Sequence, residues 1–177
     1  TGYIVNQVIQ VYDSEDWKPF SSAFIDDSFL VGYLSPEVFF NFFAILRGVS
    51  QSDLSEFLKQ FEELFNGEIL GQKKYLRDLS KGNQKKAGIV AALIGSPEVV
   101  ILDEPFANLD PTTQIRLKKI LKKINEESNS TFLISSHDLG HITEVCERIV
   151  VLEKGEAIKD LQTSEATLKE LEHFFSA

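Results

Sequence analysis

The stretch Val99-Val100-Ile101-Leu102-Asp103-Glu104-Pro105 decides the fold class of this chain. It is a short apolar run after Ser96-Pro97, and it predicts a strand buried on both faces, as in parallel sheets. Because ligands of open α/β folds bind at the carboxyl edge of parallel strands, Asp103 and Glu104 are expected at a functional edge. Two carboxylates after a strand also occur in solvated turns, so both interpretations stay open at this point.

The two acids have different expected roles. Neighbouring strand residues point to opposite sides of a sheet, so Asp103 and Glu104 do not serve the same purpose. Asp103 suits a hydrated Mg²⁺ ion, whereas Glu104 suits polarising a water molecule for attack on a phosphate.

Strand and helix patterns alternate after this stretch. Asp110-Pro111 predicts the start of a helix whose apolar residues continue to Ile124. Thr131–Ser135 predicts a second buried strand, and a helix is expected around Gly140–Cys146. This order predicts an α/β fold, in which helices cover a parallel sheet.

The two ends of the chain carry shorter elements. Residues 3–5, 8–12 and 22–25 are rich in β-branched and aromatic side chains and predict short strands. Near the C-terminus, residues 149–158 predict a hairpin, and a helix is expected from Ser164.

Residues 35–66 differ from the rest because they are rich in phenylalanine and helical in pattern. Ser35-Pro36-Glu37 predicts a capped helix start, and Gly48 ends that helix. Ser52-Asp53 predicts a second helix, closed by Gly67, with apolar residues at spacings of three and four. This spacing favours the core of a helical subdomain over a ligand-binding aromatic cluster.

An anion-binding pattern stands at Leu79-Ser80-Lys81-Gly82-Asn83. A Ser-x-Gly turn that opens a helix presents backbone N–H groups, a hydroxyl and the positive end of the helix dipole. A Ser-capped helix without a ligand gives the same pattern. Basic residues crowd this segment, and we expect most of them to form a solvated face and one or two to face phosphate: Lys73, Lys74, Arg77, Lys81, Lys85 and Lys86.

Composition excludes several classes of protein. The 177 residues include 18 basic and 27 acidic side chains, for a net charge of −9, which argues against general nucleic-acid binding. The one cysteine, Cys146, rules out a disulfide framework or a cysteine-based metal site. No apolar stretch is long enough to cross a bilayer.

Four ordered blocks of this sequence resemble the ATP-binding cassette (ABC) ATPase family. They are the signature motif (Leu79–Asn83), Walker B with the catalytic glutamate (Ile101–Glu104), the D-loop (Ala107–Asp110) and the switch histidine (His137). The resemblance covers essentially the whole chain. It implies part of a P-loop NTPase (RecA-like) parallel sheet with an inserted α-helical subdomain: a core of residues 1–33 and 96–177, and a helical subdomain over 34–95.

The resemblance also implies a role for each matching residue. Asp103 would hold Mg²⁺ through water, Glu104 would be the general base, and His137 would contact the γ-phosphate of ATP. In a head-to-tail pair of ATPase domains, Ser80 and Gly82, in one motif with Asn83, would reach the nucleotide on the opposite subunit. Asp110 would lie at the dimer interface and couple the two sites.

The implied partners are ATP, a second ATPase domain and a membrane permease. The pair of domains would be a homodimer or would join this chain to a different ATPase domain, and residues 34–95 would dock the permease. The protein would then be cytoplasmic, peripheral on the inner face of the plasma membrane. The Ser80-Lys81-Gly82 form is similar to exporter-type subunits whose permease is a separate chain.

The sequence departs from the family pattern in three places. The signature has Lys81 and Asn83 where the family most often has glycine and glutamine. By position, Asp27, or its neighbour Asp26, replaces the Q-loop glutamine. No Gly-x-x-x-x-Gly-Lys-Ser/Thr phosphate-binding loop occurs, so we expect a truncation upstream of Thr1 and weak or no ATP binding by these residues alone.

Two alternative functions remain open at this stage. One alternative is a non-transport member of the same superfamily, acting in DNA repair, chromosome organisation or translation. The other alternative is a structural or interaction module without catalysis.

Overall fold

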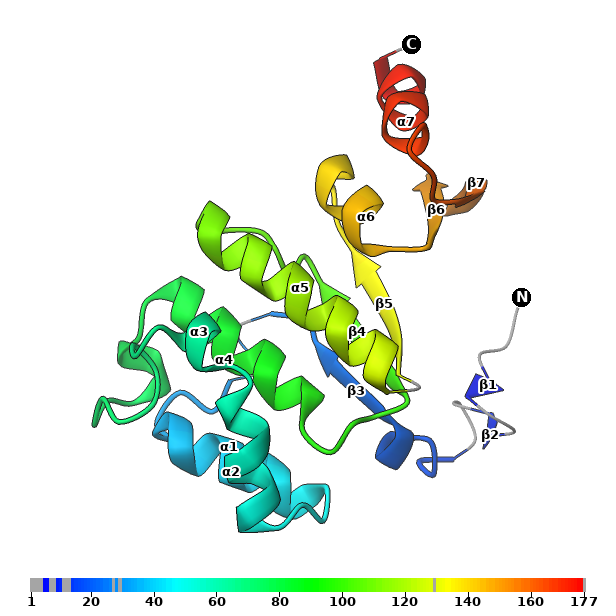
Figure 1. Cartoon of the computed structure of the whole chain (residues 1–177). Coiled ribbons are helices and arrows are strands. Elements are labelled where there is room, and N and C mark those ends of the chain that lie inside the picture. Colours follow the sequence, from blue (N-terminus) through cyan, green and yellow to red (C-terminus); the bar gives the residue numbers. More distant parts are fainter. Residues whose placement is uncertain are drawn as a thin grey trace.

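Figure 1 shows the computed structural model of the chain. The structure describes residues 5–6, 9–10, 14–26, 28, 30–128 and 130–176. Residues 36–93 form consecutive helices, strands and helices alternate over residues 99–145, and a pair of strands and a helix form a separate layer at the C-terminal end.

The central element is a parallel sheet of three strands in the order β3-β4-β5. These strands are β3 (Ser21–Phe24), β4 (Val99–Asp103) and β5 (Thr131–Ser135). The register aligns Phe24 with Leu102 and Leu102 with Ile134. The predicted α/β fold with a parallel sheet is therefore confirmed.

One face of this sheet is closed by helix α4 (Lys81–Leu93). Phe24 and Leu102 point into this interface and are buried. The helix lies so close to β3 that a Cβ atom added at Gly88 would stand 2.2 Å from Cε2 of Phe24. Glycine at position 88 is thus required by the close approach of helix and strand.

The other face of the sheet is open. Ile101 on β4 is 39% exposed and Leu133 on β5 is 63% exposed. The prediction that both strands are buried on two faces is therefore wrong for this chain. Alternate residues of a strand point to opposite sides, and burial here follows that alternation because only one face meets a helix layer.

The phenylalanine-rich segment forms helices α1 (Pro36–Leu46), α2 (Gln51–Lys59) and α3 (Glu62–Phe65). Ser35 caps α1 as predicted, with its Oγ accepting from the Val38 N–H. The second helix begins earlier than predicted, because the Oγ of Ser50 accepts from the Asp53 N–H and makes Ser50 the cap. The chain also breaks between α2 and α3 at residues 60–61.

Arg47 joins this helical segment to the edge of the sheet. Its guanidinium donates to the carbonyl oxygens of Lys18, Pro19 and Ser21, at 3.3, 2.6 and 2.5 Å. Lys18 and Pro19 lie in the short 3₁₀ helix η1 (Lys18–Phe20) that leads into β3. One side chain thus binds three carbonyl groups at the start of the edge strand.

After β4 the chain forms α5 (Pro111–Glu127), and after β5 it forms α6 (Leu139–Val145). Strands β6 (Arg148–Glu153) and β7 (Glu156–Gln162) pair as the predicted hairpin, followed by α7 (Thr167–Ser176). A second small core is buried among these last elements, made of Ile142, Ile149, Val151 and Leu171.

Of the N-terminal strands, the structure describes β1 (Val5–Asn6) and β2 (Ile9–Gln10), which pair antiparallel. The rest of the strands predicted over 3–5 and 8–12 lies outside the described residues. Among the helices that are described, none combines the length and the apolar character that a membrane span requires.

Candidate functional site

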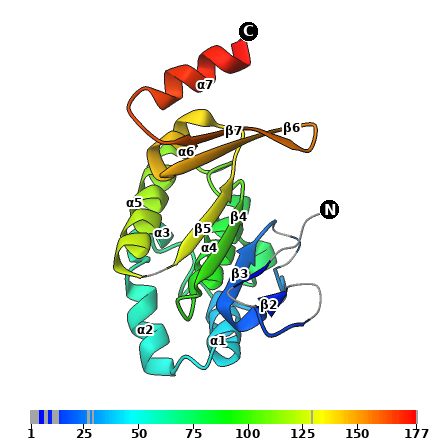
Figure 2. The same ribbon diagram turned by 90° about the vertical axis from the view of Figure 1, so that its right-hand side faces the viewer.

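The candidate site begins where β4 and β5 end next to each other. Figure 2 shows the two strands side by side, and the register pairs Asp103 with Ser135. The Oγ of Ser135 donates a hydrogen bond to Oδ1 of Asp103. Both residues are exposed, so the Asp103 carboxylate stands on the open face of the sheet with a hydroxyl beside it.

Glu104 turns out of the strand at once. Its φ of +46° lies in the left-handed region that a glutamate rarely adopts. Its N–H lies 3.1 Å from the carbonyl oxygen of Ser135 and 3.2 Å from the hydroxyl of the same residue. These bonds hold Glu104 against the end of β5 in spite of the unfavourable backbone angle.

The Glu104 carboxylate is held by the segment that follows β5. Oε1 accepts from the backbone N–H of His137 at 2.8 Å and lies 2.6 Å from its Nδ1. The hydroxyl of Ser136 donates to Oε2 at 3.3 Å. Residues far apart in sequence, Glu104 and His137, therefore form one hydrogen-bonded pair.

This pair has a clear electrostatic consequence. The hydrogen bond that the Glu104 carboxylate accepts from the imidazole, and then the negative charge of Glu104, raise the pKa of His137 above the ordinary histidine value. The Glu104 side chain is still 34% exposed, so water has access to it. A fixed carboxylate beside an imidazole is an arrangement that accepts a proton from an attacking water.

The loop that follows Glu104 is held from two helices. Lys85 of α4 donates to the carbonyl oxygens of Glu104 and Ala107, both at 2.9 Å. Gln114 of α5 donates to the carbonyl of Phe106 at 3.0 Å. The backbone of the loop between β4 and α5 is thus fixed by side-chain hydrogen bonds from both helices.

Asp110 closes this loop as the N-cap of α5. Its Oδ1 accepts from the Thr113 N–H at 3.1 Å, and its Oδ2 accepts from the Thr113 hydroxyl at 2.5 Å. The hydroxyl bond, followed by the backbone bond, lowers the pKa of Asp110. The side chain is exposed, so it caps the helix at the surface.

The predicted anion-binding turn lies against the same loop. Ser80 is exposed and caps α4, with its Oγ accepting from the Asn83 N–H at 3.2 Å. A Cβ atom at Gly82 would lie 3.6 Å from Cδ2 of Leu109 and 3.8 Å from the carbonyl oxygen of Asn108. The helix start and the loop before Asp110 are therefore neighbours.

Three side chains of α4 point inward instead of toward solvent. The Nδ2 of Asn83, which is 8% exposed, donates to Oε2 of Glu68 at 3.0 Å. Lys86 is buried, and burial lowers its pKa. With Lys85 bound to the loop, the expectation of a solvated basic face does not hold for Lys85 and Lys86.

Asp27 lies outside the described residues, so the structure gives no position for it. Its neighbour Asp26 is exposed beyond the end of β3 and accepts from the Ser28 N–H at 2.5 Å. Hydrogen bonding from Ser28 lowers the pKa of Asp26.

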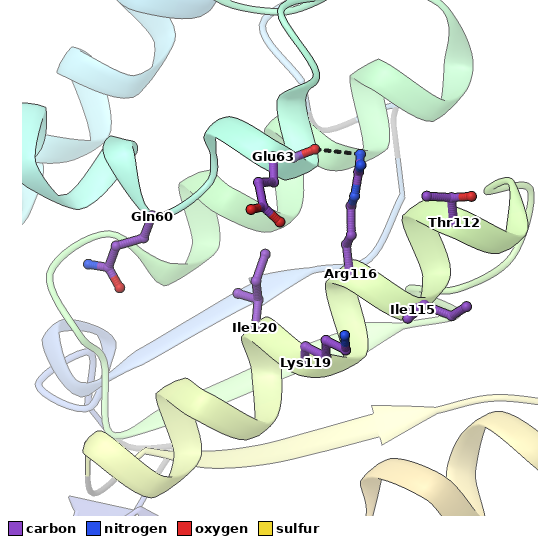
Figure 3. Close-up of a pocket in the computed structure, with 7 residues that line it drawn as sticks. All are labelled: Gln60, Glu63, Thr112, Ile115, Arg116, Lys119 and Ile120. Atoms are coloured by element: carbon purple, nitrogen blue, oxygen red, sulfur yellow. Dashed lines mark hydrogen bonds between the residues drawn. The ribbon is translucent and has the colours of Figure 1, made fainter.

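Two surface hollows flank these features. A cavity of about 250 Å³ on the open sheet face is lined by Ile25, Ile101, Leu102, Asp103, Leu133 and Ser135. Figure 3 shows another, of about 340 Å³, between α5 and the α2–α3 region, where Arg116 donates to the carbonyl of Glu63 at 2.7 Å. Of the two, the first is lined by Asp103. In the described part of the chain, no three His, Cys, Asp or Glu side chains gather as a metal cluster.

Comparison with known proteins gives the family. A family model described as "AAA domain, putative AbiEii toxin, Type IV TA system" matches residues 13–142. An uncharacterized ABC transporter ATP-binding protein of Methanocaldococcus jannaschii, MJ1023, is 34% identical over 119 residues, 66% of this chain and 44% of that protein. The chain belongs to this AAA-domain family, and it is similar to ABC transporter ATP-binding proteins.

Two further relatives are named as ATP-binding proteins. The uncharacterized ABC transporter ATP-binding protein YhaQ of Bacillus subtilis is 34% identical over 134 residues, 76% of this chain and 43% of that protein. A methionine import ATP-binding protein of Bacillus cereus, MetN 2, is 40% identical over 86 residues, 49% of this chain and 25% of that protein. The chain thus spans less than half the length of these relatives.

Solved structures share the fold. An ATP-binding subunit of an ABC transporter aligns with a TM-score of 0.79 at 22% identity, covering 100% of this chain and 72% of that chain. The dimeric ATP-binding cassette MJ0796, bound to ADP and Pi, aligns with a TM-score of 0.73 at 23% identity, covering 92% and 72%. The P-loop NTPase fold expected from the resemblance is therefore confirmed.

Three residues of the candidate site were not predicted from the sequence: Ser135, Ser136 and Lys85. The two serines stand in the quoted strand end before His137, but their link to Asp103 and Glu104 depends on the strand register, which no sequence pattern gives. Lys85 had a signal in its place on the apolar helix α4, where an inward lysine requires acceptors.

Proposed function

We propose that this chain is part of an ATP-hydrolysing subunit that powers a membrane transporter. The observation that carries the proposal is the Glu104–His137 pair, formed at the ends of adjacent parallel strands. In the proposal Glu104 accepts the proton of the attacking water, and His137 contacts the γ-phosphate while keeping the Glu104 carboxylate in place.

Asp103 is the proposed Mg²⁺ residue. Mg²⁺ prefers oxygen ligands, keeps several of its waters and is often bound through one or two carboxylates. The exposed carboxylate of Asp103 beside the Ser135 hydroxyl fits that preference. When bound with the nucleotide, Mg²⁺ supplies neutralisation of the charge on the transferring phosphoryl group.

The remaining residues of the proposed site act across a pair of ATPase domains. Ser80 and Gly82 would bind the nucleotide held by the opposite domain, with Asn83 keeping their turn in place through Glu68. Asp110, exposed at the start of α5, would couple the two sites. The positive end of α4 favours an anion at this place. Asp27 stays in the proposal as the Q-loop counterpart.

The transport partner is proposed to be a permease that docks on the helical subdomain over 34–95, at the inner face of the membrane. Support comes from the relatives of this chain, which are named ABC transporter ATP-binding proteins. Co-purification of a polytopic membrane protein with the full protein would support this part, and its absence would favour a non-transport member of the superfamily.

Hydrolysis is tested on the protein that contains this chain together with a Gly-x-x-x-x-Gly-Lys-Ser/Thr loop. Release of phosphate from Mg-ATP is measured for the wild type and for Glu104→Gln. The expected loss in kcat is about 10²-fold or more, because the amide cannot accept the proton. The control is Glu165→Gln, which changes an exposed carboxylate between β7 and α7 and is expected to keep the wild-type rate. Equal rates for Glu104→Gln and the wild type would overturn the proposal.

The 177 residues alone are expected to bind Mg-ATP weakly, because they contain no Gly-x-x-x-x-Gly-Lys-Ser/Thr loop to contact the phosphates. Calorimetric titration of the chain with Mg-ATP measures this directly. Tight binding by the chain alone would refute that part of the proposal.

A further inference from the structure

Lys85 occupies an unusual position for a lysine. It comes from the second turn of α4, the helix that Ser80 caps, and its ammonium group is directed at the loop after β4. The Nζ atom lies 2.9 Å from the carbonyl oxygen of Glu104 and 2.9 Å from that of Ala107. The side chain is half-buried, so these contacts are partly shielded from water.

The turn that Lys85 binds is the one that carries Glu104. The Ala107 N–H donates to the Glu104 carbonyl at 3.2 Å and closes the turn, so Lys85 contacts both of its ends. Glu104 holds a positive φ there, which a non-glycine residue keeps only when its surroundings impose it. Hydrogen bonds from a charged donor are stronger than neutral ones, which makes Lys85 the strongest of the loop's side-chain donors.

We propose that Lys85 is a positioning residue for Glu104. By binding the carbonyl groups at both ends of the turn, it fixes the backbone from which the Glu104 carboxylate reaches His137. The importance of this role for catalysis rests on the proposed function, in which Glu104 is the general base. In this role Lys85 acts through the backbone of Glu104 and is not itself a catalytic residue.

The same geometry links the anion-binding turn at Ser80 to the backbone of Glu104. Lys85 follows Ser80 and Gly82 on one helix, and α4 is closely packed on the sheet through Gly88. A displacement of the anion-binding turn is therefore carried along the helix to the backbone of Glu104. A phosphate-facing lysine would have no such link, because its ammonium group would be directed at the ligand instead of at two carbonyl groups.

The test is a pH titration of the histidine ring protons by NMR, made on the 177-residue chain. The charged groups that act on His137 are Glu104 and, more weakly, Asp138. In Lys85→Met the turn loses its two hydrogen bonds from Lys85, so the Glu104–His137 contact is expected to weaken. The pKa of His137 then falls toward that of an unpaired imidazole. Loss of a nearby positive charge alone would raise the pKa of His137, so the two explanations predict opposite signs.

Three controls complete the experiment. Lys85→Arg keeps a charged donor with several N–H groups and is expected to retain the wild-type titration. Lys122→Met removes a lysine charge from the exposed side of α5 and leaves His137 unchanged. His173, on the distant α7, is an internal reference in every spectrum. A His137 pKa that stays unchanged or rises in Lys85→Met overturns the proposal.

If Lys85→Met does not fold, Lys85→Gln replaces it, because an amide keeps one donor group and removes the charge. A His137 pKa between those of the wild type and an unpaired imidazole supports positioning, and a pKa that is unchanged or raised overturns it. In the full protein, the additional expectation is a lower kcat with little change in KM. Failure of hydrolysis altogether would refute the proposed function, whereas the NMR titration judges Lys85 independently of it.

Discussion

The two faces of the β3–β4–β5 sheet come from the same strands, yet they differ in how much water they meet. On the face toward α4, Leu102 is fully buried, and Gly88 brings the helix into direct contact with Phe24. On the other face, Ile101 and Leu133 remain exposed. The chain thus completes one layer of the fold and presents the second face, with Asp103 on it, to its surroundings.

An apolar strand sequence is therefore not sufficient for burial. Ile101 and Leu133 are as apolar as the buried residues beside them, and an apolar run of this kind is typical of a strand covered on both sides. Burial of each side also requires a partner layer. If the covered face supplies the stability and the open face supplies the chemistry, substitutions on the two faces should differ in their effect on the free energy of unfolding.

The largest effect is expected from Leu102→Ala on the covered face. Leu102 has no exposed surface, so truncation removes transfer energy and leaves a cavity, at a cost of about 2–5 kcal/mol in the free energy of unfolding. Urea unfolding followed by circular dichroism measures this. A loss below about 1 kcal/mol would contradict the assignment of this face as the core.

The next largest effect is expected from Gly88→Ala. The added Cβ would stand 2.2 and 2.5 Å from two atoms of the Phe24 ring, so helix or strand must shift, at a cost of about 1–3 kcal/mol. Gly82→Ala in the same helix is the matched control, because its nearest contact of 3.6 Å is ordinary. Equal unfolding midpoints for the two variants would show that α4 does not approach the sheet this closely.

A smaller effect is expected in how the Glu104–His137 pair changes the free energy of unfolding with pH. The folded-state pKa of His137 is raised by Glu104, so this pair stabilises the fold fully below the ordinary histidine pKa. The contribution is lost as pH rises through the raised value. We expect the free energy of unfolding of the wild type, relative to His137→Gln, to decrease over that window. Solvent screens an exposed pair, so the change is small. An increase with pH would contradict the contact.

The smallest effect is expected from Leu133→Thr on the open face. Leu133 is 63% exposed and threonine is well suited to strands, so the free energy of unfolding should stay within about 0.5 kcal/mol of the wild type. The comparison with Leu102→Ala is direct, since both positions lie in neighbouring strands. A loss as large as that of Leu102→Ala would mean that the face is covered in solution.

Much of the fold was predictable from local signals. Ser35-Pro36 and Asp110-Pro111 mark the starts of α1 and α5, because a capping side chain followed by proline is compatible with little else. The start of α2 was misplaced because Ser50 and Ser52 are both suitable caps, and the hydrogen bond to Asp53 is made by Ser50. The end of α2 at Lys59 was not predicted, because neither proline nor glycine stands at that point of the sequence.

The site was predictable in residue type but not in contact. Carboxylates at a strand end and a histidine at the next strand end indicated a shared edge. The bonds that Glu104 makes to His137 and Ser136 depend on a backbone turn with positive φ at a glutamate, and sequence patterns reserve that angle for glycine. Asn83 and Lys86 point inward because α4 is embedded on most sides, a fact of tertiary packing.

The Arg47 contact has a mechanical consequence. Since one guanidinium is bonded to three carbonyl groups at the start of β3, the helical segment cannot tilt relative to the sheet without moving residues 18–21 or breaking those bonds. The same side chain also lies against Gly95, just past the end of α4 opposite Ser80, so any tilt of the helical segment would disturb the turn after α4 as well.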